Sequence, residues 1–259
     1  MSNDGHRRVA WFSCGAASAV AAKMTLAAHP DSVVVYCDTM QDEHPDNRRF
    51  FDDVERWLGV KIERLTSTKY ATVDDVFEKR RYMSGVAGAI CTTEMKKLPR
   101  ERFQRPDDIH VFGYTAEERD RAEAFEERNA SLHVEWPLIN GWVTKAACLD
   151  TLQAAGIALP AMYGLGFEHN NCLGCVKSSS PGYWNHIRRL FPEVFDRRAL
   201  QSRNIGARLV KIRLPGDPLL NEKGKPFTPR HFLDELPADA DAPHDAIECG
   251  PVCQMELPL

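Results

Sequence analysis

The cysteines of this chain have positions that suggest a shared metal site. Cys172 and Cys175 are separated by two residues, a spacing that lets both thiolates bind one metal ion or cluster. Iron–sulfur clusters and structural zinc ions usually take four protein ligands, so two more must come from elsewhere in the chain. Cys91 and one of Cys249 or Cys253 are the natural candidates. The pattern predicts a 4Fe-4S cluster, with zinc as the less favoured alternative.

A run of small residues forms a second candidate site near the amino terminus. The small side chains of 13–18 would let backbone N–H groups and two hydroxyls approach an anion at the start of a helix. The run lacks the Gly-Lys-Ser/Thr of a Walker A loop and the three glycines of the dinucleotide fingerprint. By itself it is equally consistent with a turn that packs a helix onto a sheet. The residues expected at the phosphate are Ser13, Cys14, Gly15, Ala16 and Ser18.

Apolar runs that alternate with helical patterns predict the elements that would position these residues. Buried strands are expected over 8–12, 33–37, 61–65, 109–114 and 132–136, and helices over 16–28, 46–58 and 116–128. Such strands pair in parallel through right-handed crossovers, which predicts an α/β, Rossmann-like, doubly wound and mostly parallel sheet. Ligands of these sheets bind beyond the carboxyl ends of the strands. Besides 13–18, those ends carry Asp38, Thr39 and Gly113.

The pattern changes after residue 137 and predicts three segments. Residues 1–140 would form the nucleotide-binding α/β core. Residues 141–213 would be a helical extension that carries Cys172 and Cys175, with helices over 143–155 and 183–206. Residues 214–259 are rich in proline and acidic residues and would form an irregular tail that carries Cys249 and Cys253.

Charge and hydropathy limit the partners and the compartment. The formal net charge of −4 argues against binding nucleic acid by bulk electrostatics, and the arginines over 188–213 are read as a solvated helix face. No apolar run reaches the length of a membrane span, and residues 1–6 lack the apolar core of a signal peptide. We therefore expect a cytoplasmic protein, in which clustered cysteines serve metal or redox chemistry rather than disulfides. Cys37 and Cys148, in apolar surroundings, are expected to be core residues.

The motifs together resemble a known family. The run 13–18 resembles the PP-loop of the adenine nucleotide α-hydrolase superfamily, Ser-Gly-Gly-x-x-Ser, except that Cys14 replaces the first glycine. Further segments are similar to those of the phosphoadenosine phosphosulfate (PAPS) reductase family and follow in its order, over 36–45, 91–99, 113–119, 136–139 and 160–175. The resemblance covers about residues 8–190. In cluster-bearing members the second of these segments starts with tandem cysteines, whereas here Thr92 follows Cys91.

The resemblance implies a role for each matched residue. The run 13–18 would hold phosphate or sulfate oxygens, and Asp38 would lie beside the ribose or a metal ion. Lys96 and Arg119 would neutralise the leaving anion, because negative charge concentrates where a sulfate or pyrophosphate separates. Cys14 is expected to be inert filler rather than a sulfur acceptor, since the loop acts through its backbone.

The tail holds the motif Glu248-Cys249-Gly250, which is similar to the motif of the nucleophilic cysteine in sulfonucleotide reductases. A histidine closes that motif in the family, whereas Pro251 follows here. Cys249 could therefore be a nucleophile, a fourth cluster ligand, or a redox partner of Cys253.

Three functions are compatible with these motifs. The favoured one is a PAPS reductase-like enzyme that reduces an adenylyl sulfonucleotide, PAPS or its unphosphorylated analogue APS, to sulfite with a thioredoxin-like dithiol reductant. The second is an ATP pyrophosphatase-type sulfurtransferase that uses ATP with Mg²⁺, a cysteine desulfurase, and a nucleic-acid or small-molecule acceptor. The third is a non-catalytic nucleotide-binding subunit of a larger complex. The oligomeric state stays open, with a homo-oligomer as one possibility.

Overall fold

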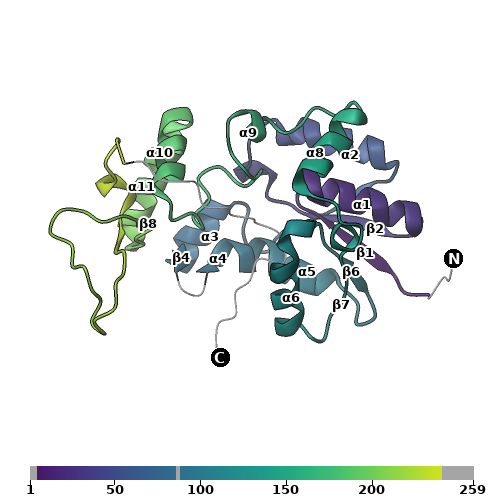
Figure 1. The fold of residues 1–259 in the computed structure, drawn as a ribbon, viewed down its shortest axis with the longest axis horizontal. Helices are drawn as coiled ribbons and strands as arrows, with labels where there is room; N and C mark the ends of the chain where they lie inside the picture. The colour runs from purple at the N-terminus through teal and green to yellow at the C-terminus, as the bar shows by residue number, and fades with distance from the viewer. Residues whose placement is uncertain (1–4, 86–87, 241–259) are drawn as a thin grey trace.

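The computed structural model describes residues 5–85 and 88–240. Its central sheet has five parallel strands in the order β3-β2-β1-β6-β7 (Figure 1). The strands are β1 (Arg8–Phe12), β2 (Val33–Cys37), β3 (Ile62–Leu65), β6 (Ile109–Val111) and β7 (His133–Glu135). The predicted doubly wound α/β fold is confirmed. Strand order reverses between β1 and β6, and such a switch point is where sheets of this kind bind ligands.

The strand β1 is buried along its whole length, and its side chains alternate between two cores. Ala10 and Phe12 pack under α1, α2 and α8 on one face of the sheet. Val9 and Trp11 pack on the opposite face, which α6 covers. Burial on both faces explains why residues 8–12 read as a continuous apolar run. The covering helices are α1 (Ala16–Ala28), α2 (Asn47–Leu58), α8 (Lys145–Ala154) and α6 (Arg119–Arg128).

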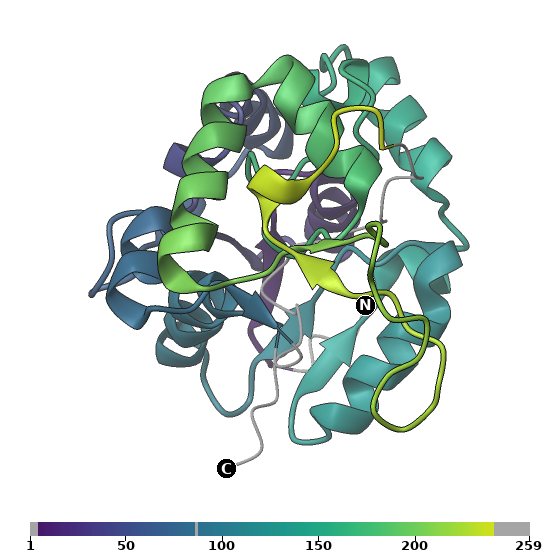
Figure 2. The same ribbon diagram turned by 90° about the vertical axis from the view of Figure 1, so that its left-hand side faces the viewer.

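A third core lies beside the sheet and joins segments that are distant in the chain. Figure 1 shows its helices to the left of the central sheet, and Figure 2 shows a short antiparallel hairpin on the side that faces the viewer. The helices are α3 (Val73–Arg80), α4 (Ile90–Thr92), α10 (Pro181–Leu190), α11 (Pro192–Ile205) and the 3-10 helix η4 (Leu233–Glu235). The hairpin is formed by β8 (Val210–Lys211) and β9 (Arg230–His231).

Short elements connect these layers. They are η1 (Met40–Asp42), β4 (Ser84–Gly85), β5 (Gly88–Ala89), η2 (Thr93–Lys97), α5 (Leu98–Phe103), η3 (Ala116–Glu118), α7 (Pro137–Asn140) and α9 (Ala161–Gly164). The segment η2 is a single π-helical turn between α4 and α5. One-turn π-bulges of this kind occur often at functional sites.

Three predicted elements differ from the observed ones, besides shifts of one or two residues at other ends. The helix expected over 116–128 is the 3-10 helix η3 followed by α6. The helix expected over 183–206 is two helices, α10 and α11, because Pro192 lacks an N–H and forces Phe191 out of the helical conformation, to a φ of −138°. The strand expected over 109–114 ends at Val111, and the residues after it form a loop at the carboxyl edge of the sheet.

The predicted irregular tail is described only as far as residue 240, where it contains β9 and η4. Cys249 and Cys253 lie outside the described residues, so the structure gives no position for either thiol. Among the described residues, no helix has both the length and the apolar character needed to cross a membrane.

Candidate functional site

The two hydroxyls of the small-residue turn face each other at the start of α1. Ser13 donates from its backbone N–H and from its Oγ to Ser18 Oγ, at 3.0 and 3.1 Å. Ser18 Oγ in turn donates to the carbonyl of Gly15 at 3.0 Å. Gly15 is the N-cap residue of α1 and has no side chain to cap the helix. The turn therefore presents hydroxyls and backbone N–H groups together, a combination that suits an anion.

Gly113, in the loop that follows β6, lets the backbone of the small-residue turn approach closely. A Cβ atom at Gly113 would lie 2.6 Å from Ser18 Cα and 2.7 Å from Ser18 N. No side chain other than hydrogen fits that space. The predicted convergence of residues 13–18 and Gly113 at one edge of the sheet is confirmed by this contact.

Cys14 is buried in the core and has a strained backbone. Its φ is 59°, a left-handed backbone conformation that residues other than glycine rarely adopt. Its side chain is fully buried. Burial, followed by the nearby carboxylate of Glu43, raises the pKa of its thiol well above the usual range. Its Sγ contacts the carbonyl of Asn47 at 3.6 Å. Burial and a raised thiol pKa are what a filler residue would show, and the filler role of Cys14 stays a prediction.

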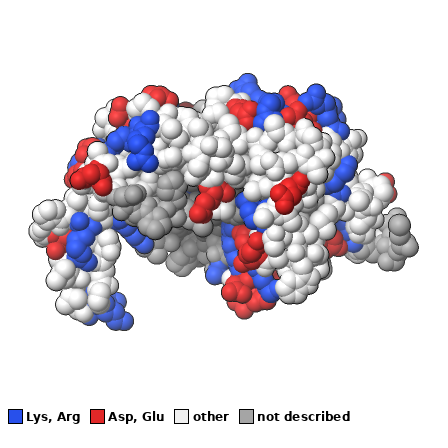
Figure 3. Space-filling model, turned by 45° about the horizontal axis from the view of Figure 1, so that its top comes forward, with Lys and Arg blue, Asp and Glu red and all other residues white. Residues whose placement is uncertain are grey.

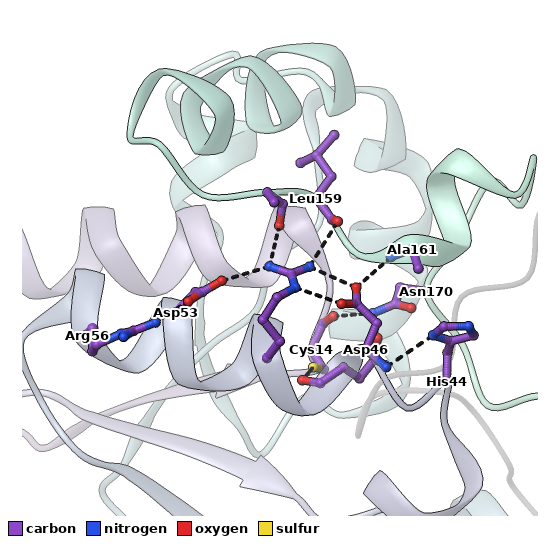
Figure 4. Close-up of polar contacts among 11 residues, drawn as sticks. Cys14, His44, Asp46, Asp53, Arg56, Leu159, Ala161 and Asn170 are labelled. Atoms are coloured by element: carbon purple, nitrogen blue, oxygen red, sulfur yellow. Dashed lines mark hydrogen bonds and ion pairs between the residues drawn. The ribbon is translucent and has the colours of Figure 1, made fainter.

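Asn170 ties the loop that leads to Cys172 onto this turn (Figure 4). Its Nδ2 donates to the carbonyl of Cys14 at 2.7 Å and to Asn47 Oδ1 at 2.8 Å. Because both partners are acceptors, the amide nitrogen of Asn170 must point toward them. Its Oδ1 is then buried and has no hydrogen-bond partner in the described part of the chain. The predicted anion turn and the predicted metal loop are therefore joined through one side chain.

The end of β2 carries Asp38 and Thr39, as expected, but both side chains already have protein partners. Asp38 accepts the N–H of Met40 at 3.0 Å and forms an ion pair with Arg64 at 2.7 Å. Thr39 donates from Oγ1 to Glu43 Oε1 at 2.7 Å. These contacts hold the segment after β2 against the sheet, and the ribose or metal role of Asp38 stays a prediction.

The π-helical turn η2 buries Lys96 between the two predicted sites. Lys96 is 6% exposed. Its positive charge lowers the pKa of both the Cys14 and the Cys37 thiols, although burial of each thiol has the larger, opposite effect. The charge therefore lies near the carboxyl ends of both β1 and β2, where an anionic ligand would need it.

Three cysteines that the sequence placed in one set line the same small pocket. Cys91, at the half-buried start of α4, and the buried Cys172 and Cys175 meet there with Lys96 and Thr39. Leu173, between the latter two cysteines, donates its N–H to the carbonyl of Asp42 at 2.8 Å. The loop of 172–175 is thereby anchored to the segment that follows β2.

A buried arginine supports the turn between Cys172 and Cys175. Arg198, on α11, is 1% exposed and donates from Nε to the carbonyl of Gly174 at 3.2 Å. Its Nη1 contacts Asp74 and donates to Gln201 Oε1 at 2.6 Å. Gly174 has a φ of 64°, and a Cβ there would lie 2.8 Å from Val194 Cγ1. The turn therefore requires glycine, and the guanidinium that supports it is ion-paired with Asp74.

The pocket brings together thiols, but their arrangement is not that of a metal site, and the predicted cluster or zinc ion stays a prediction. In residues 5–85 and 88–240, no group of three or more His, Cys, Asp and Glu side chains is arranged to hold a metal ion. Three cysteines nevertheless line one pocket together with the buried hydroxyl of Thr92, which has no hydrogen-bond partner among the described residues. Soft thiolates of this kind select zinc or iron–sulfur clusters.

Arg119 lies at the first residue of α6, exposed, with its guanidinium 5.1 Å from the centre of the Trp142 ring. Trp142 is 74% exposed and has a φ of 53°. The anion-neutralising role of Arg119 stays a prediction.

Most of the arginines over 188–213 are exposed, as the expected solvated face requires, but Arg198 is an exception and others pair with neighbouring segments. Arg198 is buried, Arg188 donates to the carbonyl of Leu236 at 2.9 Å, and Arg203 pairs with Asp234 at 2.6 Å. Periodicity alone could not reveal these tertiary partners. On the face drawn in Figure 3, acidic and basic side chains are interspersed rather than gathered by sign.

Cys37 and Cys148 are core residues, as predicted. Both are buried, and burial raises the pKa of each thiol to about 12. Sequence reasoning missed the contacts of Asn170 and Arg198, because each side chain reaches a partner more than twenty residues away in the chain.

A scan of the chain against models of known protein families finds no match, and no curated protein sequence matches it.

Proposed function

We propose that this chain is a PAPS reductase-like enzyme that reduces an adenylyl sulfonucleotide to sulfite at the expense of thiols. The observation that carries the proposal is the hydrogen bond from Asn170 to Cys14 at 2.7 Å, which links the Cys172 loop to the small-residue turn. Lys96 supports it further, because its charge acts at the strand ends and its side chain lines the cysteine pocket. An anion site and a cysteine pocket in direct contact suit a substrate that is both a nucleotide and a sulfur compound.

In this proposal the turn binds the anionic part of the nucleotide. Backbone N–H groups of α1 and the hydroxyls of Ser13 and Ser18 would hold its oxygens, and Lys96 would balance the charge of the departing phosphate. Closely fitted donors in a buried site stabilise developing charge more than water does.

The chemical step needs a nucleophilic thiolate, for which Cys249 is the candidate. Its sulfur would attack the sulfonate sulfur, the bond from that sulfur to the phosphate oxygen would break, and the adenosine phosphate would leave. A thiol of the dithiol partner would then attack Cys249, release sulfite, and close a disulfide as its second thiol follows. The sulfonate sulfur gains two electrons, and two thiols lose them. Cys91, Cys172 and Cys175 are the residues that would hold a cluster or a zinc ion in this proposal.

Sulfite production tests the proposal directly. The protein purified without oxygen should release sulfite from PAPS or APS when a dithiol reductant is present, and Cys249→Ser should release none. Ser18→Ala should lower the rate by about 10–100-fold, because the hydroxyl and the turn that it organises are lost. Ser32→Ala is the matched control and should retain the rate. Ser32 is a buried serine just before β2, at the amino end of the strand, and donates from its Oγ to the carbonyl of His29.

The second candidate is the ATP-dependent sulfurtransferase. Thr92 favours it, since this residue stands where cluster-bearing sulfonucleotide reductases are expected to have a second cysteine. Pyrophosphate released from ATP, with no sulfite from either sulfonucleotide, would contradict the reductase and support the sulfurtransferase. The burial of Cys14 and the raised pKa of its thiol count against Cys14 as the sulfur acceptor of this alternative.

The non-catalytic alternative depended on the altered loop residues Cys14 and Ala16. Both side chains are fully buried in the core under α1. Buried side chains at these positions do not occupy the exposed side of the turn, so they give little support to a dead site.

A further inference from the structure

Cys14 occupies a backbone conformation that suits glycine. Its φ of 59° lies in the left-handed region, where the Cβ of any other residue meets a steric cost. Two other non-glycine residues in the described part of the chain have a positive φ, Arg81 and Trp142, and both are exposed, whereas Cys14 is fully buried. A strained residue persists only where its surroundings hold it in place.

Two contacts hold Cys14, one at its side chain and one at its carbonyl. The thiol lies 3.6 Å from the carbonyl of Asn47, and the carbonyl of Cys14 accepts from Asn170 Nδ2 at 2.7 Å. Asn170 is itself fixed, because the same Nδ2 donates to Asn47 Oδ1 at 2.8 Å. Asn47 Nδ2 donates to the Glu43 carboxylate at 2.7 Å, so Asn47 must turn its oxygen toward Asn170.

Asn170 keeps its orientation although this leaves one of its atoms unpaired. The side chain is 7% exposed, and Oδ1 has no hydrogen-bond partner among the residues that the structure describes. A buried polar atom without a partner calls for an explanation. Turning the amide over would place Oδ1 against two other oxygens, those of Cys14 and Asn47, and both donated bonds would be lost.

The carbonyl of Cys14 and the N–H of Gly15 belong to one planar, trans peptide unit. The two groups point in opposite directions, so a hydrogen bond that fixes the carbonyl also fixes the N–H. Within the described residues the Gly15 N–H has no hydrogen-bond partner. A Cβ at Gly15 would lie 3.7 Å from Ser13 Oγ, which places this N–H close to the hydroxyls of the turn. It is therefore available to an anion that those hydroxyls bind.

We propose that Asn170 is a positioning residue for nucleotide binding. By holding the Cys14 carbonyl, it keeps the Gly15 N–H directed at the anion and lets a cysteine occupy a position that suits glycine. The inference rests on the anion site of the proposed function. It gives a role in binding to a side chain that acts through the turn and not by touching the nucleotide.

Nucleotide binding to the full chain tests the inference. Isothermal titration calorimetry with PAPS, APS and ATP gives the Kd of each. Asn170→Ala should raise the Kd of the nucleotide that binds best about tenfold, because Cys14 relaxes and the Gly15 N–H turns away from the anion.

Asn185→Ala is the matched control. Asn185 is a buried asparagine on α10, and its Nδ2 also donates to two oxygens, the carbonyls of Pro237 and Ala240. The variant loses the same number of bonds in the third core and should keep the wild-type Kd.

Cys14→Gly supplies a readout that a merely structural role of Asn170 would not move. Glycine adopts the left-handed conformation without strain, so Asn170→Ala combined with Cys14→Gly should raise the Kd only about threefold or less. Cys14→Ala removes the thiol but keeps the Cβ, and in that background Asn170→Ala should retain its effect of about tenfold. The midpoint of urea unfolding should follow the same pattern, with a smaller loss from Asn170→Ala in the Cys14→Gly background.

An equal effect of Asn170→Ala in the Cys14→Gly and Cys14→Ala backgrounds would overturn the inference. So would an Asn185→Ala protein whose Kd rises as much as that of Asn170→Ala, and so would a chain that binds none of the three nucleotides. Binding without sulfite production would instead contradict the proposed reductase alone, because calorimetry needs no turnover.

Discussion

His110 lies on β6 with its ring between two aromatic rings. It is 1% exposed, stacks on Trp11 and Phe112, and accepts a hydrogen bond from Trp11 Nε1 at 3.0 Å. Burial, followed by the charge of Arg100, lowers its pKa to about 4. A ring that must stay neutral in the folded state makes stability depend on pH.

The sign of that dependence follows from the lowered pKa. The stabilising contribution is complete above the ordinary pKa of 6.5 and is lost as the pH falls toward about 4. Between pH 7.5 and pH 5 the free energy of unfolding should fall by about 2 kcal/mol on this account. His110→Asn keeps an acceptor near Trp11 Nε1 and should remove that part of the slope in urea unfolding at the two pH values.

His6→Asn is the matched control, since His6 is exposed and its Nδ1 lies 3.2 Å from the carbonyl oxygen of Asp107, just before β6. It should leave the slope as in wild type. A His110→Asn protein that retains the full loss between pH 7.5 and pH 5 would show that other groups cause it.

At the level of single residues, the sequence predicted side chains that share a local motif. Ser13 and Ser18 are five residues apart in the chain, and their hydroxyls are 3.1 Å apart in the structure. Arg198 and Asn170 could not be found in this way. Their partners, Gly174 and Cys14, lie 24 and 156 residues away, and only the tertiary fold brings them together.

Between elements, the packing of α1 on β6 depends on Gly113. An added Cβ would lie 2.6 Å from Ser18 Cα, and backbone cannot move aside cheaply. Gly113→Ala should therefore lower the free energy of unfolding by about 1–3 kcal/mol, and it should weaken nucleotide binding because Ser18 is displaced. Urea unfolding and equilibrium binding of an adenosine nucleotide measure the two effects.

Gly164→Ala provides the comparison for this substitution. Gly164 ends α9, and a Cβ there would have no atom within 4 Å. The variant should match wild type or be slightly more stable, because alanine reduces the entropy of the unfolded chain. Equal stability of the two variants would contradict the close approach of α1 and β6.

The packing of the turn of 172–175 against α11 depends on Gly174. Gly174→Ala combines a left-handed backbone with a Cβ at 2.8 Å from Val194 Cγ1 on α11. It should lower the iron content after reconstitution, because the two cysteines of the turn are displaced. Gly216→Ala has a similar backbone strain, at a φ of 90°, but no atom within 4 Å of the added Cβ. It should keep the iron, whereas equal loss in both variants would attribute the effect to backbone strain alone.

Element boundaries were predictable where burial is continuous. The sequence predicts β1, α1 and β2 with the bounds that the structure has, since buried apolar runs and small-residue helices give strong periodic signals. The break between α10 and α11 at Pro192 and the π-helical turn of η2 were not predicted. A π-turn depends on i→i+5 hydrogen bonds, which leave no clear periodicity in the sequence.

For the whole molecule, a bound nucleotide should stabilise the fold that holds it. A ligand that binds only the folded state at a concentration of about 100 Kd adds about 2.7 kcal/mol. For a chain of 259 residues this corresponds to a rise in Tm of roughly 5–10 °C. Differential scanning calorimetry with PAPS, APS and ATP should show the rise for the preferred nucleotide. Ser18→Ala should reduce it, and an unchanged Tm with all three would contradict a nucleotide site.

The overall arrangement could be predicted only in part. Alternating strands and helices predict a parallel sheet, and the structure confirms it. The third core was not predicted, because it joins residues 73–95 to residues 162–236, and contacts over such distances leave no local pattern. The division into segments 1–140, 141–213 and 214–259 stays a prediction.

Trp142 gives the protein a built-in optical probe. It is 74% exposed, whereas Trp11, Trp136 and Trp184 are at most 7% exposed. Collisional quenchers in solution should therefore reach its fluorescence far more readily than that of those three tryptophans. Iodide is attracted by the Arg119 guanidinium stacked on this indole, while acrylamide is indifferent to charge. The ratio of iodide to acrylamide quenching thus reports the local potential beside Arg119, and it should fall when an anionic ligand takes up that arginine's charge.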